Sequence, residues 1–279
     1  MLQIIQSQKH QINLIVGEEG FGKSRLLSEL ERKLKNLNFH YVRIGMPSKQ
    51  APYESALTLI QHIAKESGSA ALNNTLQMFS KSTRQVESNL RYRLFDEAML
   101  NLQQLLEDRP QIILIDDIHL CQQPSYDFFL YLSNALIERL ELPLFFFVSS
   151  IYSESQFVQA NVVPLKELNE EKILRLFEQL APNQENIHLI ARKIHQETDG
   201  IPLFLNAFIK QLLDDNVLRF KGDRYIFLKS SESIAKQTFN IPPTIRQLSK
   251  KRLDLLSDKQ LELLKVLAVS GRALHLDIL

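Results

Sequence analysis

Residues 17–24, Gly-Glu-Glu-Gly-Phe-Gly-Lys-Ser, fit the pattern G-x-x-x-x-G-K-[ST] at every fixed position. An apolar run over residues 12–16 precedes this segment, and leucines at helical spacing follow it at positions 26, 27, 30, 34 and 37. Strand, glycine-rich loop and helix in this order are typical of a phosphate-binding loop. The alternative is a plain glycine turn before an amphipathic helix. It is disfavoured because three of the chain's eight glycines fall inside these eight residues.

Each fixed residue of this loop has a chemical reason. Glycines let backbone N–H groups turn toward a β-phosphate, and the positive end of the helix dipole adds to the attraction. Lys23 is expected to reach the β- and γ-phosphates, and Ser24 to hold Mg²⁺. Arg25 directly follows and is predicted to belong to the same nucleotide-binding group, together with the three glycines of the loop, Gly17, Gly20 and Gly22.

A second motif lies at residues 112–117, where four aliphatic residues are followed by two acids. This pattern predicts a fully buried parallel strand that ends in a site. Beside a phosphate loop, Asp116 is placed to hold the Mg²⁺ shell and Asp117 to polarise the attacking water. The alternative is a strand that runs into an Asp-Asp turn, and the upstream loop favours the functional interpretation. His119 follows, and both a nucleotide contact and an ordinary loop histidine remain open.

Two further apolar runs complete the predicted sheet. Residues 142–148 read as a buried strand that ends at Ser149-Ser150. In phosphate-loop ATPases with an added strand, this strand lies between the loop strand and the acidic strand. Ser149 and Ser150 are therefore candidates to sense the γ-phosphate, unless they only cap the strand end. Residues 162–165 include a proline and predict an edge strand.

The remaining pattern of the chain is largely helical. In the first part we predict a strand over 39–44, helices over 51–65, 90–106 and 126–139, and a loose helical excursion over 67–89. From Asn169 onward, helices are predicted over 169–180, 187–198 and 202–215, with Asn169 as N-cap. A hairpin over 217–228, a polar linker over 229–240, and helices over 244–256, 258–270 and from 274 follow.

Composition limits the classes of partner. The net charge of +1 gives no global electrostatic reason for binding nucleic acid or an acidic membrane surface. The single cysteine excludes an internal disulfide and fits a reducing compartment, and no catalytic role is predicted for it. The longest uncharged apolar run is too short to span a bilayer. We therefore expect a cytoplasmic protein without a membrane partner.

With these motifs in place, the sequence resembles the signal-transduction ATPases with numerous domains, specifically the Orc1-like AAA ATPase module of LuxR-type and maltose-regulator-type regulators. The first two motifs indicate only a phosphate-loop ATPase. The segments Thr198–Phe204 and Arg252–Arg272 select this family. The resemblance implies that Pro202 packs on adenine, although a proline at the start of an ordinary helix is an alternative.

The resemblance also implies a domain plan and an α/β fold. A phosphate-loop NTPase domain with a parallel sheet and helices on both faces is expected over residues 1–165. A small helical lid domain is expected over 166–216, and a hairpin, a linker and the truncated start of a winged-helix domain over 217–279. Two departures from the family pattern predict weak binding and slow hydrolysis: no Gly-Arg-Glu segment precedes the loop, and no arginine follows Ser149-Ser150.

The leading functional hypothesis is an ATP- and Mg²⁺-dependent switch module that hydrolyses ATP slowly. Its expected partners are ATP or ADP, output domains beyond this chain, and other copies through nucleotide-dependent self-association. A DNA-associated ATPase of the replication-initiator type is the main rival, since residues 241–279 carry seven Lys/Arg against four Asp/Glu. A nucleotide-stabilised scaffold without turnover is a third possibility. No Asn-Lys-x-Asp guanine motif occurs, which disfavours a GTPase. A dinucleotide-binding dehydrogenase is disfavoured by the glycine order.

Overall fold

The computed structural model of the chain describes residues 11–46, 51–81, 88–139, 144–153, 156–157, 159–182, 184–222, 224–236, 250, 253 and 256–270. Two compact units make up the chain, Met1–Lys166 and Glu167–Leu279.

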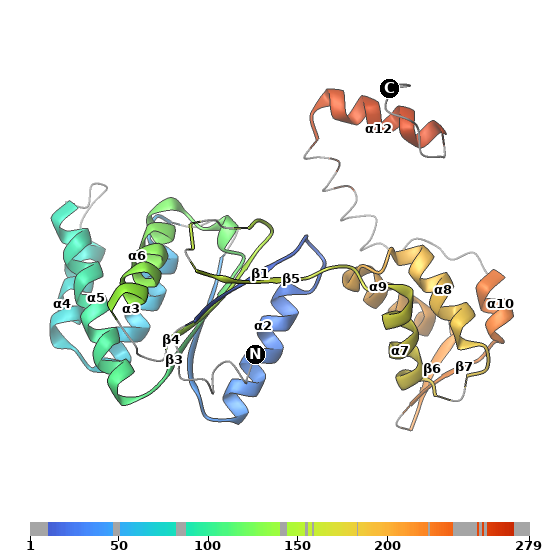
Figure 1. Cartoon of the computed structure of the whole chain (residues 1–279), viewed down its shortest axis with the longest axis horizontal. Coiled ribbons are helices and arrows are strands. Elements are labelled where there is room, and N and C mark those ends of the chain that lie inside the picture. The colour runs from blue at the N-terminus through green and yellow to red at the C-terminus, as the bar shows by residue number, and fades with distance from the viewer. Residues whose placement is uncertain are drawn as a thin grey trace. The chain divides into compact units, whose positions relative to one another are not determined.

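A five-stranded sheet forms the centre of the first unit (Figure 1). Its strand order is β2-β3-β4-β1-β5, and every neighbouring pair is parallel. Strand β4 therefore lies between β1 and β3, and β5 is an edge strand, as the sequence predicts. The strands are β1 (Gln11–Val16), β2 (His40–Gly45), β3 (Gln111–Asp116), β4 (Leu144–Ser150) and β5 (Asn161–Pro164).

Helices cover both faces of this sheet, because successive strand residues point to opposite sides. Ile112 and Leu114 of β3 pack with helix α2 (Lys23–Asn36), whereas Ile113 and Ile115 belong to the core on the other face. That second face is covered by α3 (Glu54–Ser67), α5 (Ser88–Asp108) and α6 (Gln123–Arg139). This is the fold of a phosphate-loop NTPase, and the predicted fold class is confirmed.

The helical character predicted over residues 67–89 is correct for its described part, but the expectation that this helix is loose is wrong. A regular helix, α4 (Ala70–Lys81), occupies it, and α5 already begins at Ser88. Leu72, Thr75 and Phe79 are buried and repeat at helical spacing, so the serine- and asparagine-rich segment has one face that packs into the core.

The second unit has its own apolar core, formed by helices α7 (Glu170–Leu180), α8 (Ile187–Thr198) and α9 (Pro202–Asp214). The predicted N-cap of α7 is present, since Asn169 Oδ1 accepts a hydrogen bond from the backbone N–H of Lys172 at 3.0 Å. The predicted hairpin is formed by β6 (Leu218–Lys221) and β7 (Arg224–Phe227).

The predicted polar linker over 229–240 contains a short helix, α10 (Ser231–Lys236), so that expectation is also wrong. Ile234 is buried in the core of the second unit and anchors α10 there. Helix α12 (Asp258–Ser270) agrees with the helix predicted there. The helix predicted over 244–256 lies mostly outside the described residues, and the one from 274 lies wholly outside them.

Candidate nucleotide site

The predicted phosphate loop joins the end of β1 to the start of α2. The N–H of Gly17 donates to the carbonyl of Ser150 at 3.2 Å, which ties the loop to the end of β4. Gly20 and Gly22 adopt left-handed backbone angles, with φ of 93° and 92°. Such angles disfavour any residue with a Cβ, so the two glycines allow the chain to curl back over the N-terminus of α2.

Lys23 lies in the first turn of α2 and is almost fully buried. Its ammonium donates to the carbonyl oxygens of Gly17 at 2.8 Å and Glu18 at 3.0 Å. Burial lowers the pKa of Lys23, while the negative charges of Asp117, Asp116 and Glu19 act in the opposite direction. These partners hold a desolvated cation at the mouth of the loop, where phosphate oxygens would compete with the two carbonyls.

Ser24 and Asp116 meet although they lie in different motifs. The hydroxyl of Ser24 donates to Asp116 Oδ1 at 3.0 Å, and the hydroxyl of Ser149 donates to the same oxygen at 2.8 Å. Oxygen ligands of this kind suit Mg²⁺, which usually takes one or two protein groups and completes its shell with water and phosphate oxygens. The residues present therefore fit the predicted metal.

Asp117 follows in a left-handed conformation with φ of 57°, so the extended backbone of β3 ends at Asp116. Its N–H donates to Ser149 Oγ at 2.8 Å. Burial raises the pKa of the Asp117 carboxyl, and the charge of Asp116 raises it further. A carboxylate with a raised pKa is a better proton acceptor than an ordinary aspartate, which agrees with the role predicted for it.

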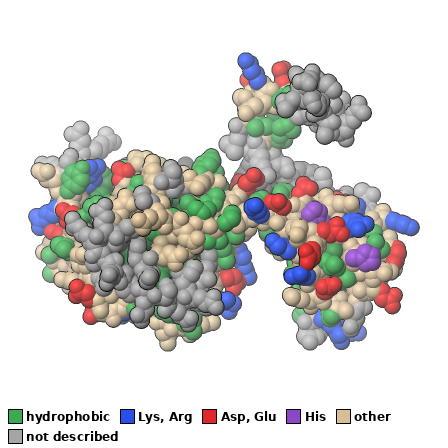
Figure 2. All heavy atoms as spheres, in the orientation of Figure 1, with side chains coloured by type: hydrophobic (Ala, Val, Ile, Leu, Met, Phe, Trp, Pro, Cys, Tyr) green, Lys and Arg blue, Asp and Glu red, His purple; other side chains and the backbone are tan. Residues whose placement is uncertain are grey.

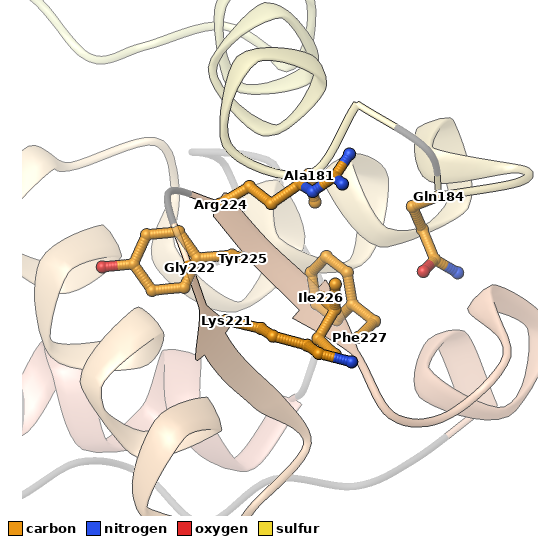
Figure 3. Close-up of a pocket in the computed structure, with 8 residues that line it drawn as sticks. All are labelled: Ala181, Gln184, Lys221, Gly222, Arg224, Tyr225, Ile226 and Phe227. Carbon is orange, nitrogen blue, oxygen red and sulfur yellow. The ribbon is translucent and has the colours of Figure 1, made fainter.

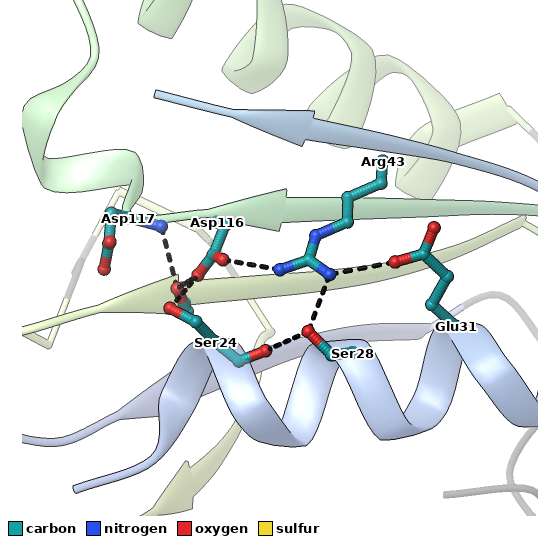
Figure 4. Close-up of polar contacts among 7 residues, drawn as sticks. Ser24, Ser28, Glu31, Arg43, Asp116 and Asp117 are labelled. Carbon is teal, nitrogen blue, oxygen red and sulfur yellow. Dashed lines mark hydrogen bonds and ion pairs between the residues drawn. The ribbon is translucent and has the colours of Figure 1, made fainter. Parts of the chain in front are cut away.

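Sequence reasoning missed Arg43, on strand β2 (Figure 4). One guanidinium nitrogen donates to Asp116 Oδ2 at 2.8 Å. The other donates to Glu31 at 2.8 Å and to Ser28 at 2.9 Å, both on α2. Burial alone would lower the pKa of Arg43, but the hydrogen bonds to Glu31 and Asp116 raise it overall. The one signal in the sequence was a charged residue near the end of a predicted strand.

The other predicted site residues have different surroundings. Arg25 forms an ion pair with Glu29 at 2.7 Å along the exposed side of α2. Ser150 Oγ accepts from the N–H of Tyr152 at 3.1 Å, so the two serines of β4 differ in their partners. Pro202 begins α9 in the second unit, and its contact with adenine stays a prediction.

A hollow of about 530 Å³ lies beside the hairpin of the second unit (Figure 3). Its lining includes Lys221 and Arg224 from the hairpin and Gln184 from the α7–α8 connection. It shares no residue with the phosphate loop, and none of the residues predicted to bind nucleotide lines it.

A family model described as an AAA domain matches residues 6–152, more than half of the chain. The chain belongs to the AAA domain family. The matched part of the AAA domain contains the phosphate loop, both acids of the β3 end and the serines of β4. No curated protein matches the chain. Within the described residues, no helix has the length and apolar character needed to cross a membrane.

Solved structures extend the fold comparison beyond the AAA domain. The chain is similar to a signal transduction ATPase with numerous domains from Pyrococcus horikoshii, which has a tetratricopeptide repeat sensor. The identity is 17%, the TM-score is 0.50, and the alignment covers 96% of this chain and 34% of that one. The chain thus spans about a third of that protein's length. The shared fold is shown over nearly the whole chain, in agreement with the predicted resemblance.

Replication proteins show weaker likeness. Drosophila ORC bound to DNA has 12% identity and a TM-score of 0.49, over 92% of this chain and 61% of that one. DnaA from Aquifex aeolicus, bound to AMPPCP, has 13% identity and a TM-score of 0.42, over 75% of this chain and 59% of that one. At these scores, neither likeness carries an argument about function.

Proposed function

We propose that this chain binds ATP with Mg²⁺, hydrolyses it slowly, and serves as a nucleotide-dependent switch within a larger protein. The observation that carries the proposal is the hydrogen bond between Ser24 and Asp116, beside the buried Lys23. It joins the phosphate loop to the acidic strand end, which is the arrangement needed to hold a metal against nucleotide phosphates.

In this mechanism, Lys23 and the loop N–H groups bind the phosphates, and Ser24 and Asp116 would hold Mg²⁺. When bound, the ion would supply positive charge that offsets the negative charge of the phosphates. Asp117 orients the attacking water and accepts its proton, and Ser149 holds the backbone of Asp117 in place. The conformational output is proposed to reach the second unit and further domains, with Pro202 resting on adenine.

A thermal-shift experiment with Mg·ATP tests the binding step. A ligand present at about 100 times its Kd stabilises a folded protein by roughly 2.7 kcal/mol, so wild-type protein should show a clear increase in Tm. Lys23→Ala should abolish the increase, because it removes the loop's ammonium. Lys33→Ala, on an exposed position of the same helix, is the matched control and should keep it. An equal shift in Lys23→Ala and wild type would contradict the loop assignment.

The rival function in DNA handling rests on the basic surplus of residues 241–279, most of which lie outside the described part of the chain. On the face of the second unit seen in Figure 2, basic and acidic side chains are interspersed. An interspersed surface gives little electrostatic attraction for a phosphate backbone. Retention on duplex DNA at two salt concentrations separates the proposals, since true phosphate contacts depend steeply on salt.

A further inference from the structure

The two carboxylate oxygens of Asp116 have separate sets of partners (Figure 4). Oδ1 accepts hydrogen bonds from Ser24 and Ser149, and Oδ2 accepts one from Arg43. Because both serines bind the same oxygen, they alone would leave Oδ2 without a described partner. The bond from Arg43 therefore fixes the rotation of the carboxylate and presents Oδ1 toward Ser24.

Arg43 is itself held rigidly by the helix that starts at the phosphate loop. Its guanidinium is a planar fork: Nη2 donates to Asp116, and Nη1 donates to Glu31 and Ser28. The hydroxyl of Ser28 in turn donates to the carbonyl of Ser24 at 2.8 Å. One side chain of β2 thus connects the end of β3 to the first three turns of α2, and no motif of the sequence includes it.

Arg43 has two opposing effects on a cation at this site. Its positive charge repels Mg²⁺, but its hydrogen bonds orient the ligand. Glu31 lies as close to Arg43 as Asp116 does, at 2.8 Å, so one cation is shared by two carboxylates. The three side chains together keep a net negative charge, which attracts a cation despite the presence of Arg43.

We propose that Arg43 is a positioning residue for the metal, which sets the Mg²⁺ affinity of the nucleotide site by holding Asp116 through Oδ2. The inference rests on the proposed nucleotide binding and adds a residue to it. Groups that orient a metal ligand are typically worth 10- to 100-fold in metal affinity.

The test measures binding of a fluorescent ATP analogue to Arg43→Met across a Mg²⁺ titration and in EDTA. In Arg43→Met, we expect the Mg²⁺ concentration that gives half of the Mg²⁺-dependent gain in analogue binding to rise about tenfold or more. The affinity for the analogue in EDTA should stay within about twofold of wild type. Arg32→Met is the control: Arg32 pairs with Glu29 on the exposed side of α2, so its titration should match wild type. Arg43→Lys keeps the charge but lacks the fork, so its midpoint should rise by less.

The possible outcomes are separable. An unchanged Mg²⁺ midpoint in Arg43→Met overturns the inference and leaves the proposed function intact. Equal losses in EDTA and in Mg²⁺ also overturn it, because they indicate a purely structural role. If Arg43→Met does not fold, Arg43→Lys replaces it: a raised Mg²⁺ midpoint supports the inference, and an unchanged midpoint overturns it. A wild-type protein that binds no nucleotide overturns the proposed function, and the inference with it.

Discussion

At the scale of single residues, Ser149 joins two acids to which the sequence gives different roles. Its hydroxyl donates to Asp116 Oδ1 and accepts from the backbone N–H of Asp117. Both bonds are 2.8 Å long, and the side chain is fully buried. The geometry therefore gives Ser149 a positioning role for both acids, whereas sensing of the γ-phosphate by Ser149 or Ser150 stays a prediction.

Replacing this hydroxyl should cost stability as well as order in the site. We expect Ser149→Ala to lower the free energy of unfolding by about 1–3 kcal/mol, because the N–H of Asp117 and one side of Asp116 lose their partner. Urea denaturation measures the change. Ser80→Ala removes an exposed hydroxyl that donates to the carbonyl of Gln77, and should stay within about 0.5 kcal/mol of wild type. Equal effects of the two variants would contradict the positioning role.

The two acids themselves should separate by function. Asp116→Ala should lose the Mg²⁺-dependent part of nucleotide binding, since it removes the oxygen that faces Ser24. Asp117→Asn should bind ATP like wild type and lose turnover, because an amide keeps the shape but accepts no proton. Binding by thermal shift and phosphate release on the same samples distinguish these effects. Wild-type turnover by Asp117→Asn would show that another residue positions the water.

Much of the site was predictable from sequence because the loop and the strand end have fixed spacings. Lys23, Ser24 and Asp116 follow from those spacings, and the structure brings them together. Arg43 was not predictable in this way. Its partners on α2 and β3 become neighbours only through the pairing of β2 with β3 and the packing of α2, and neither follows from a local pattern.

At the scale of elements, the turn between α8 and α9 packs closely against the backbone of Leu168. Gly200 has φ of +68°, and its N–H and carbonyl are both engaged: the carbonyl accepts from the N–H of Leu168 at 2.8 Å. A Cβ at Gly200 would lie 1.9 Å from the carbonyl oxygen of Leu168. That atom belongs to the backbone, so it has little room to move.

Gly200→Ala should therefore destabilise the second unit by about 3 kcal/mol or more, from the strained angle and the overlap together. Gly222→Ala provides a matched control in the same unit. Its φ is +70° but no atom lies within 4 Å of the added Cβ, so only the angular cost of about 1 kcal/mol applies. Denaturation monitored by circular dichroism gives both values. Similar losses of unfolding free energy in the two variants would show that the contact between residue 200 and the Leu168 carbonyl is not the cause.

The two elements that sequence reasoning described incompletely share one property. Helices α4 and α10 are rich in serine, asparagine or charged residues, so their composition predicts only a loose helix for α4 and a polar linker for α10. In each case a few buried positions decide the outcome, such as Phe79 in α4 and Ile234 in α10. Burial of these side chains depends on surfaces supplied by distant parts of the chain, and local propensity does not contain that information. The strongly apolar strands needed no such context.

At the scale of the whole molecule, the chain alone should turn over ATP very slowly. A positioned arginine at the γ-phosphate is worth about 10³- to 10⁵-fold in rate. Two arginines of α5 have partners of their own: Arg93 pairs with Glu97 at 2.8 Å, and Arg91 lies over the ring of Tyr92 at 4.7 Å. Arg43 is held by Asp116 and Glu31.

Phosphate release by a dilute monomeric sample should stay orders of magnitude below a typical kcat of about 10 s⁻¹. Specific activity should rise with protein concentration if a neighbouring copy supplies the missing arginine. Steady-state assays over a range of concentrations, with the mass in solution followed by light scattering, measure both. Rapid turnover by a demonstrated monomer would contradict the switch and favour a motor.

The strand order has a consequence for how the protein is made. Synthesis runs from the N-terminus, so the phosphate loop leaves the ribosome long before β4. Yet β1 and β3, which end in the loop and the acids, are not neighbours: β4 separates them, and Gln11 pairs with Phe145. Ser24 and Asp116 reach hydrogen-bonding distance only after Ser150 has emerged and the sheet has closed around β4. If ATP binds as proposed, it should stabilise the finished sheet and have no effect on the first steps of folding.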